Sequence, residues 1–373
     1  MRIQVVDPPA FTPPYDHALS AALVRAGVEV ELLTSRFPYG EVPAGEGYRT
    51  DELFYRRASA PGLAPAARRA LRLAEHLPGM GRLRRRARTA DVVHLQWLTL
   101  GVLDRFLLPR GVPLVYTLHD PLPEGGRALS RERALLGRMD AVVTHTEQGA
   151  RSLRERAGYD HERVHVIPHG AFDYLTRLPQ ERPLPDELRE VEGPVVLCFG
   201  LIRPYKGIDV LLQAFREVEG AELWIVGRAM MPLGPLRELA DRCPGTVRFL
   251  PRFITDPEIP AFFRRADVVV LPYRRSEQSG VLYTALAFGR PLVASAVGGF
   301  PEVGERGAAR IVPPGDPREL AVALRELLGD PGARRALTEA AAAAASGVYS
   351  WDQIAARTVE LYRRLAGGPG APG

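Results

Sequence analysis

Short apolar runs alternate with longer helical patterns along nearly the whole chain of 373 residues, and this alternation most constrains the fold. Strands and helices in this order form βαβ units, whose strands lie parallel in one sheet. A polar, proline-rich stretch at 178–185 interrupts the alternation, which then starts again. The pattern therefore predicts an α/β protein with two doubly wound, Rossmann-like domains that face each other across a cleft.

The expected strands are short and rich in Val, Ile and Leu. In the first half they are Ile3–Val6, Val28–Leu33, Val92–Leu95, Leu114–Leu118, Ala141–Thr144 and Val164–Ile167, with helices at His17–Ala26 and Glu147–Ala157 among others. In the second half they are Val195–Phe199, Leu223–Val226, Val247–Leu250, Val268–Leu271, Pro291–Ala294 and Arg310–Val312, with helices that begin near Gly207, Leu233, Asp256, Val281 and Pro317. We therefore predict domains at 1–178 and 194–345, a linker at 179–193 and a disordered tail at 367–373.

The composition excludes several classes of protein. The two cysteines, Cys198 and Cys243, are too few for a disulfide framework and lack metal-ligand spacing, which favours a reducing cytosol. The chain starts with an apolar strand and has no signal-peptide pattern. No apolar run approaches the ~20 residues that a membrane span needs. We expect a cytoplasmic protein with no bound metal or cofactor.

Lys206 is the only lysine of the chain, although Lys and Arg together number 49. The sequence contains no Asn and is rich in Arg, Ala, Gly and Pro, a bias under which Arg has replaced nearly every solvent-facing Lys. A retained lysine indicates a site that needs a compact, flexible ammonium rather than a planar guanidinium. Survival by chance is the alternative, but chance would not favour its position between a strand and a helix.

The loop after Val195–Phe199 predicts an anion site. Gly200, Arg203 and Lys206 follow the carboxyl end of this strand, and the next helix begins near Gly207. Backbone N–H groups, the helix dipole and two cations favour a phosphate there. Ser279 and Gly280 precede another helix and form a second candidate. Ordinary strand-to-helix turns are the alternative for both positions, and the solitary lysine argues against this alternative at the first.

Several stretches of the second half together resemble the retaining GT-B glycosyltransferases of family 4. They are 199–212, 266–273, 279–291, 298–302 and 313–316. The first half resembles these enzymes only in its rhythm of strands and helices. The segment with Trp351 and Tyr362 resembles the terminal helix of the family, which crosses back to the first domain. This helix is expected here at 346–366.

The resemblance implies transfer of a sugar, with retention, from a UDP- or GDP-linked donor to a glycan or lipid-linked acceptor. It assigns the donor diphosphate to Gly200, Arg203, Lys206, Ser279 and Gly280. Protein cations would then stabilise the leaving group in place of a metal. The sequence contains no Asp-x-Asp pair that would hold a divalent metal on the diphosphate.

The chain departs from the family pattern at the donor sugar and ribose. Two family glutamates are replaced by Ser276 and Thr284, with Glu277 and Gln278 nearby, and a family arginine is replaced by Leu201. Hydroxyls bind sugar oxygens more weakly than carboxylates do. Two alternatives therefore stay open: a non-catalytic GT-B subunit that binds a partner glycosyltransferase or glycan, and a GT-B-type sugar-nucleotide epimerase.

Polar residues at strand ends of the first half are candidates for the sugar and acceptor side. His119 follows Leu118 and resembles the family's active-site histidine, which would orient the sugar or help the acceptor lose its proton. Capping of a turn is the alternative. Further candidates are His94, Gln96 and Trp97, with a buried structural Trp as an equal alternative, and Tyr15 and His17 in a loop at 12–17. His169 is expected at a simple turn.

Residues 68–88 carry eight arginines interleaved with leucines, opposed only by Glu75, and Pro78-Gly79 is expected to break this helix. A basic amphipathic segment can lie on an anionic membrane, which would place the protein at the inner face of a membrane with a lipid-linked acceptor. A basic solvated helix is the alternative. Nucleic acid is disfavoured because no nucleic-acid module accompanies the charge.

Overall fold

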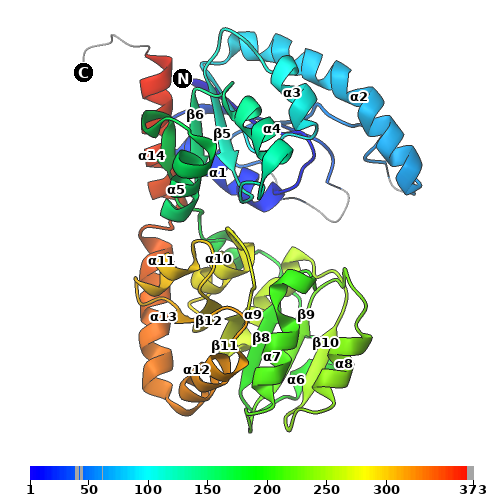
Figure 1. Cartoon of the computed structure of the whole chain (residues 1–373), viewed down its shortest axis with the longest axis vertical. Helices are drawn as coiled ribbons and strands as arrows, with labels where there is room; N and C mark the ends of the chain where they lie inside the picture. The colour runs from blue at the N-terminus through cyan, green and yellow to red at the C-terminus, as the bar shows by residue number, and fades with distance from the viewer. Residues whose placement is uncertain (38–41, 43–44, 61, 368–373) are drawn as a thin grey trace. The chain divides into compact units, whose positions relative to one another are not determined.

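The structure, a computed structural model, describes residues 1–37, 42, 45–60 and 62–367. They form two compact α/β units (Figure 1). One comprises Met1–Gly170 and the segment from Trp351 onward, and the other is Ala171–Ser350. The segment 179–193, predicted as a linker, lies in the second unit and contains the short helix α6, Asp186–Arg189. Apart from Gly367, the predicted tail lies outside the described residues.

The described part of the first unit contains a seven-stranded parallel sheet in the order β3-β2-β1-β4-β5-β6-β7. Its strands are β1 Arg2–Asp7, β2 Glu29–Thr34, β3 Arg49–Glu52, β4 Val92–Leu95, β5 Leu114–Leu118, β6 Ala141–Thr144 and β7 Val164–Val166. The strand order reverses between β1 and β4. Ligands of such sheets bind beyond the carboxyl ends of the strands at this kind of reversal.

The edge strand β3 is the one that the apolar pattern did not predict. Its residues Arg49, Thr50, Asp51 and Glu52 are polar and mostly exposed, and it pairs with β2 through its backbone. A solvated edge strand needs no apolar run, so the periodicity of the sequence carries no signal for it.

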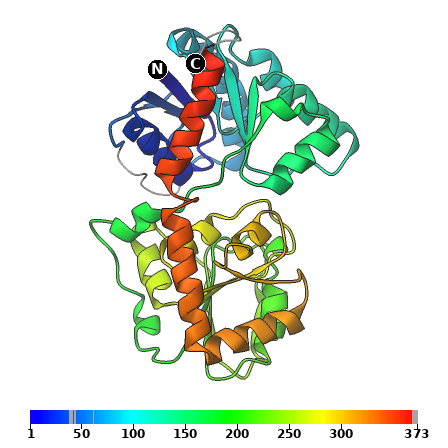
Figure 2. The ribbon, with the colours of Figure 1, turned by 90° about the vertical axis from the view of Figure 1, so that its left-hand side faces the viewer.

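Helices cover both faces of the first sheet. They are α1 Pro13–Arg25, α2 Pro65–Arg86, α3 Gly101–Leu107, α4 Gly126–Leu136, α5 Glu147–Ala157 and α14 Trp351–Ala366. Alternate strand residues such as Val93 and Tyr116 pack with α2, α4 and α5. The opposite face meets α1 and α14, which lie side by side (Figures 1 and 2).

Helix α1 begins four residues earlier than predicted. Pro13 and Pro14 occupy its first positions, where a missing N–H costs no helical hydrogen bond and the fixed φ suits the helix. The prediction of a loop at 12–17 is therefore wrong: Tyr15 and His17 belong to the first turns of α1.

Helix α2 continues through Pro78, so the predicted break at Pro78-Gly79 is wrong. Tertiary contacts hold the helix on both sides of the proline. Glu75 accepts hydrogen bonds from the backbone N–H groups of Arg57 and Ala58 at 3.1 and 3.0 Å. Gly79 packs so closely that a Cβ there would lie 2.8 Å from the Phe54 ring. Within the described ranges, no helix is long and apolar enough to cross a membrane.

The second unit repeats the architecture. Its described residues form a six-stranded parallel sheet in the order β10-β9-β8-β11-β12-β13. The strands are β8 Val195–Phe199, β9 Glu222–Val226, β10 Val247–Leu250, β11 Val268–Leu271, β12 Leu292–Ser295 and β13 Arg310–Val312. The helices after α6 are α7 Ile208–Phe215, α8 Gly234–Ala240, α9 Ile259–Arg265, α10 Gly280–Ala287, α11 Phe300–Gly304, α12 Pro317–Gly329 and α13 Pro331–Ser346.

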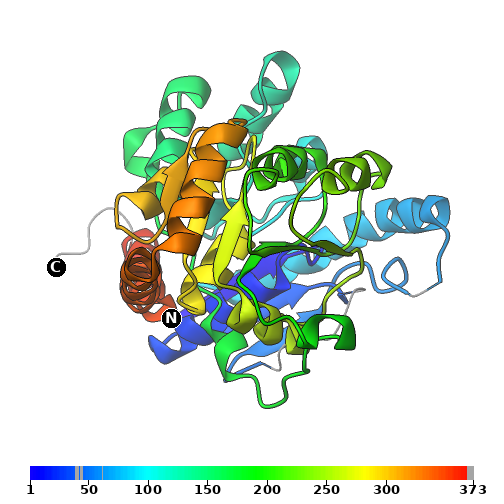
Figure 3. The same cartoon turned by 90° about the horizontal axis from the view of Figure 1, so that it is seen from below.

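The four central strands of the second sheet, β9, β8, β11 and β12, are buried on both faces, whereas the edge strands β10 and β13 are partly exposed. Val196, Cys198 and Ile225 pack in one core with α7, α8 and α12. The alternate residue Trp224 points to the other face, where its ring meets Phe262 of α9. Figure 3 shows helices on both sides of this sheet. Burial on both faces explains why the strands read as unbroken apolar runs in the sequence.

Candidate functional site

The loop that follows β8 is held against the end of β9. The Gly200 N–H donates to the Val226 carbonyl at 2.9 Å, and Gly200 has a φ of 98°. A Cβ on Gly227 would lie 2.2 Å from the Gly200 carbonyl oxygen, so only glycine allows this approach. The predicted anion loop therefore begins as a closely packed backbone turn at the carboxyl edge of the sheet.

Gly207 ends the same loop and begins α7 in a left-handed conformation, with a φ of 65°. A Cβ there would lie only 1.9 Å from the Pro272 carbonyl oxygen at the end of β11. Nearby, Arg274 forms two hydrogen bonds with Asp209, at 2.6 and 2.5 Å. The loop after β8 is thus fixed to the segment after β11.

Lys206 lies inside this arrangement, with 6% of its surface exposed. Its Nζ atom donates a long hydrogen bond of 3.4 Å to the Phe199 carbonyl and lies 5.0 Å from the centre of the Tyr273 ring. No carboxylate forms an ion pair with it in the described part of the chain. Burial lowers the pKa of the Lys206 ammonium below its usual value. A buried cation without a counter-charge is costly, which favours an anionic ligand at this position.

The second predicted anion position lies next to the first. The Tyr273 hydroxyl lies 3.2 Å from the Ser279 hydroxyl, and Ser279 is the residue before α10. Tyr273 therefore contacts both Lys206 and Ser279. Gly280 opens the helix, and a Cβ there would lie 3.1 Å from the Phe172 ring. The structure thus brings the residues predicted for the diphosphate together, with Arg203 exposed on the same loop.

The side chains predicted for the donor sugar and ribose are largely engaged within the protein. Ser276 donates to the Gln278 carbonyl at 2.6 Å, and Thr284 donates within α10 to the Gly280 carbonyl at 2.8 Å. Gln278 accepts a hydrogen bond from the Tyr283 hydroxyl. Glu277 is partly exposed. The hydroxyls of Ser276 and Thr284 therefore donate to the protein's own backbone and do not offer the free acceptor oxygens of a carboxylate.

In the first unit, His119 follows β5 and is surrounded by three of the predicted residues. The Trp97 ring stacks on its imidazole with a centroid distance of 5.0 Å and an angle of 12°. The Tyr15 ring meets it edge-on at 4.9 Å, and Gln96 Oε1 lies 3.0 Å from His119 Nε2. Tyr15 is buried beneath the imidazole, so it supports His119 rather than presenting a surface to a ligand.

His145 is a member of this cluster that the sequence analysis missed. Its Nε2 atom lies 3.3 Å from His119 Nδ1, and its Nδ1 atom lies 3.0 Å from the Ile167 carbonyl oxygen. The register of the sheet pairs Leu118 with Thr144, so the next residues of these parallel strands are neighbours. His119 follows β5 and His145 follows β6, and this shared position after consecutive strands could have identified the pair from the sequence.

The contacts fix the proton positions of both rings. Burial lowers the pKa of His145 to about 4 and that of His119 well below its usual value, so both are neutral near pH 7. A carbonyl only accepts, so His145 Nδ1 carries the proton and its Nε2 accepts. His119 Nδ1 must then carry a proton and donate to His145, which leaves His119 Nε2 as an acceptor.

Gln96 must therefore present its amide nitrogen to His119 Nε2. With Oε1 toward the ring, Gln96 Nε2 is buried and lacks a hydrogen-bond partner among the described residues. Rotation of the carboxamide by 180° exchanges the two atoms at no steric cost and gives the nitrogen a partner. Both ring nitrogens of His119 are then held by protein groups.

Three other histidines were considered in the sequence, and the structure gives each of them a different set of contacts. His94 contacts the hydroxyls of Thr117 at 2.7 Å and of Tyr362 in α14, and burial lowers its pKa to about 3. His17 contacts the Tyr48 hydroxyl. His169, expected at a turn, packs against both His145 and Trp351, which makes it part of the aromatic support.

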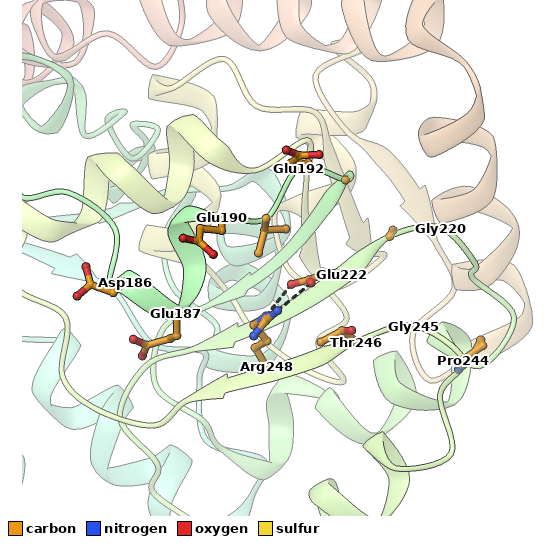
Figure 4. A pocket seen from close by; sticks show the side chains of 13 residues that line it. Asp186, Glu187, Glu190, Glu192, Gly220, Glu222, Pro244, Gly245, Thr246 and Arg248 are labelled. Carbon is orange, nitrogen blue, oxygen red and sulfur yellow. Dashed lines mark hydrogen bonds and ion pairs between the residues drawn. The ribbon is translucent and has the colours of Figure 1, made fainter.

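A pocket of about 690 Å³ lies at the opposite, amino end of the second sheet (Figure 4). Acidic side chains dominate its lining, and Arg248 is paired with Glu222 at 2.7 Å. This charge disfavours a diphosphate. Within the described residues, no group of three or more His, Cys, Asp and Glu side chains is arranged to hold a metal ion.

Family models match both halves of the chain. Residues 15–171 match "Glycosyltransferase Family 4", and residues 193–330 match "Glycosyl transferases group 1". A D-inositol 3-phosphate glycosyltransferase of Xylanimonas cellulosilytica is 31% identical over 92% of this chain and 89% of its own length. The chain belongs to the group 1 glycosyltransferases.

Solved structures agree with this family in fold. Sucrose-phosphate synthase of Thermosynechococcus elongatus superposes with a TM-score of 0.75 at 21% identity, over 99% of this chain and 100% of that one. HepE of Anabaena, solved with UDP-glucose, gives a TM-score of 0.72 at 20% identity, over 97% of this chain and 100% of that one. The prediction of two parallel-sheet, Rossmann-like units of the GT-B type is confirmed.

Proposed function

We propose that this glycosyltransferase moves a sugar from a UDP- or GDP-linked donor to a glycan or lipid-linked acceptor, with retention at the anomeric carbon and without a metal. The Lys206 ammonium is buried and pairs with no carboxylate among the described residues, and this observation carries the proposal, since a donor diphosphate would supply the missing negative charge. The Anabaena relative in fold binds UDP-glucose, which supports a nucleotide sugar as the ligand of this chain.

The chemistry requires stabilisation of a departing diphosphate. When the bond to the sugar breaks, negative charge grows on the leaving phosphate, and fixed cations and N–H dipoles lower the energy of that state. Lys206, Arg203 and the backbone N–H groups at the start of α10 are suited to this role. Because these groups supply positive charge, no divalent metal is needed on the diphosphate.

A thermal unfolding screen tests the proposal. UDP, GDP, ADP and their sugar conjugates would be added to the wild-type protein and to Lys206→Ala. A ligand at about 100 times its dissociation constant adds about 2.7 kcal/mol of stability, which shifts the transition visibly. We expect one nucleotide to stabilise the wild type and not the variant. An equal shift in both proteins would contradict the role of Lys206.

Retention and metal independence need a transfer assay with the donor found in the screen. The anomeric coupling of the product, followed by NMR from the first turnovers, distinguishes retention from inversion. Transfer after treatment with EDTA should equal transfer before it. A rate that falls with EDTA and returns with a divalent cation would contradict the metal-free mechanism.

A second candidate, a non-catalytic subunit that binds a partner glycosyltransferase or glycan, is favoured by the residues that replace the family glutamates. The hydroxyls of Ser276 and Thr284 are bound to backbone carbonyls. A nucleotide-induced shift without turnover of any donor, together with a stable partner in pull-downs, would support this candidate. Transfer by the purified chain alone would exclude it.

We further propose that the protein is cytoplasmic and binds the inner face of a membrane through α2. Leu73 and Leu77 are 61% and 54% exposed on this arginine-rich helix. Apolar side chains among cations are suited to an anionic bilayer surface. The double variant Leu73→Ser/Leu77→Ser should lose sedimentation with anionic vesicles, whereas Val322→Ser, a change of an exposed apolar residue on α12, should retain it.

A further inference from the structure

A second pocket, of about 400 Å³, lies between the C-terminal half of α2 and the edge strand β3. Its lining contains four arginines, Arg56, Arg82, Arg85 and Arg86. The other lining residues are Asp51, Leu53 and Thr89. The strands β2, β1 and β4 separate β3 from β5, which leads to His119. The pocket is therefore distinct from the cluster of side chains around His119.

Arg86 lines one side of this pocket, and protein carboxylates balance its charge. Its guanidinium pairs with Glu31, and its Nη2 atom lies 2.6 Å from Asp51 Oδ2. Glu31 is buried and also accepts from Gln4 at 3.0 Å, so the pair is anchored in the sheet. The Arg86 guanidinium is therefore paired within the protein, and its role is to hold α2 against β2 and β3.

Two other guanidiniums are fixed mainly by neutral groups. Arg82 donates from Nη1 to the Leu53 carbonyl at 2.9 Å. Arg56 donates from Nε to the Glu52 carbonyl at 2.8 Å and makes only a long contact of 3.4 Å with Asp51. A carbonyl positions a guanidinium without cancelling its charge, and each guanidinium has five N–H donors. Most of their donors stay available.

The pocket carries excess positive charge. Arg85 is exposed, and in the described part of the chain no carboxylate forms an ion pair with it. Among the residues that the structure describes, the four guanidiniums form ion pairs only with Asp51 and Glu31, and Arg86 pairs with both of these carboxylates. A concave surface with unbalanced charge of one sign concentrates counter-ions.

We propose that this pocket binds a phosphate group carried by a small molecule or a lipid headgroup. Guanidinium forks match the tetrahedral oxygens of phosphate and donate to them in pairs. The pocket volume falls within the range of small-ligand sites, so it has room for a phosphate and the glycerol or sugar attached to it. This anion site is separate from the donor loop and does not depend on the proposed transfer reaction.

The test uses the full chain with Lys206→Ala, so that phosphate binding at the donor loop does not contribute. Inorganic phosphate and glycerol 3-phosphate are titrated by calorimetry at constant ionic strength. Arg82→Gln/Arg85→Gln removes two lining cations and spares Arg86, which is paired with the buried Glu31. Arg69→Gln/Arg88→Gln removes the same charge from exposed positions outside the pocket. Chemical denaturation of each protein confirms that it is folded.

We expect saturable binding whose dissociation constant rises at least about tenfold in the pocket variant and stays nearly unchanged in the control variant. Vesicles of phosphatidylcholine with and without phosphatidylglycerol form the second arm. The pocket variant, unlike the control variant, could lose binding to the anionic vesicles while neither small phosphate binds. This result would support the proposal and assign the phosphate to a lipid. Equal behaviour of the pocket and control variants toward every probe, or no binding of any probe by the parent, would overturn it.

Discussion

The Nε2 atom of His145 lies 3.3 Å from Nδ1 of His119, where two neighbouring parallel strands end. The Ile167 carbonyl fixes the proton on the far nitrogen of His145, and this in turn fixes the proton on His119. Since Gln96 holds the other side of the His119 ring, the imidazole has one orientation and one tautomer. His145 is therefore a positioning residue for His119.

Replacement of His145 should disturb His119 in a way that packing alone does not explain. His145→Leu removes the acceptor for the His119 Nδ1 proton, and we expect sugar transfer to fall about tenfold or more. His145→Gln keeps an acceptor there and should recover part of the rate. Nitrogen chemical shifts of labelled His119 should report the Nδ1-protonated tautomer in the wild type and in His145→Gln, and a mixture in His145→Leu. Equal rates and equal shifts in the two variants would argue for simple packing.

The buried histidines should make the fold sensitive to mild acid. The pKa of His145 is about 4 in the folded chain and about 6.5 when exposed, so the unfolded chain binds this proton first as the pH falls. The contribution of neutral His145 to the unfolding free energy is therefore complete above about pH 6.5 and is lost as the pH falls toward 4. For this group the loss is on the order of 3 kcal/mol. Urea unfolding at several pH values should show a shallower loss for His145→Phe than for the wild type. An identical slope would show that His145 does not titrate as described.

The sequence predicted those parts of the structure that depend on burial and on local chain geometry. Apolar runs identified the strands of both sheets apart from β3, because strands buried on both faces contain few polar residues. Lys206 and Ser279 were predicted as two anion positions, each just before a helix, and the family resemblance assigned both to the donor diphosphate. In the structure Tyr273 contacts each of them. The strand positions needed only the apolar pattern, whereas the common site needed the resemblance as well.

Other features depend on which strands become neighbours, and the sequence alone does not state this. His145 contacts His119 only because β5 and β6 pair in one register. The continuity of α2 through Pro78 depends on Phe54 and on the backbone of Arg57 and Ala58, which come from a separate segment. The arginine pocket likewise combines α2 with the unpredicted edge strand β3.

Two glycines with similar backbone angles should respond very differently to substitution. Gly27 and Gly207 have φ values of 85° and 65°, so alanine strains the backbone at either position by about 1–2 kcal/mol. A Cβ on Gly27 would meet nothing within 4 Å, whereas one on Gly207 would lie 1.9 Å from the Pro272 carbonyl oxygen. Gly207→Ala should therefore lower the unfolding free energy by clearly more than Gly27→Ala does, and should also weaken nucleotide binding. Equal destabilisation in urea titrations would contradict the packing of the loop on β11.

Lys206→Met should separate stability from function. Methionine keeps much of the side-chain length but removes a buried ammonium that no carboxylate balances in the described part of the chain. Removal of an unpaired buried charge leaves the unfolding free energy unchanged or raises it by about 1–3 kcal/mol. Sugar transfer should fall by about 10²–10³, as when a group that stabilises developing negative charge is lost. The exposed Arg203 provides the control, since Arg203→Gln should weaken nucleotide binding without a gain in stability. Strong destabilisation of Lys206→Met would mean that the ammonium is part of the fold, whereas near-normal transfer would move the donor site elsewhere.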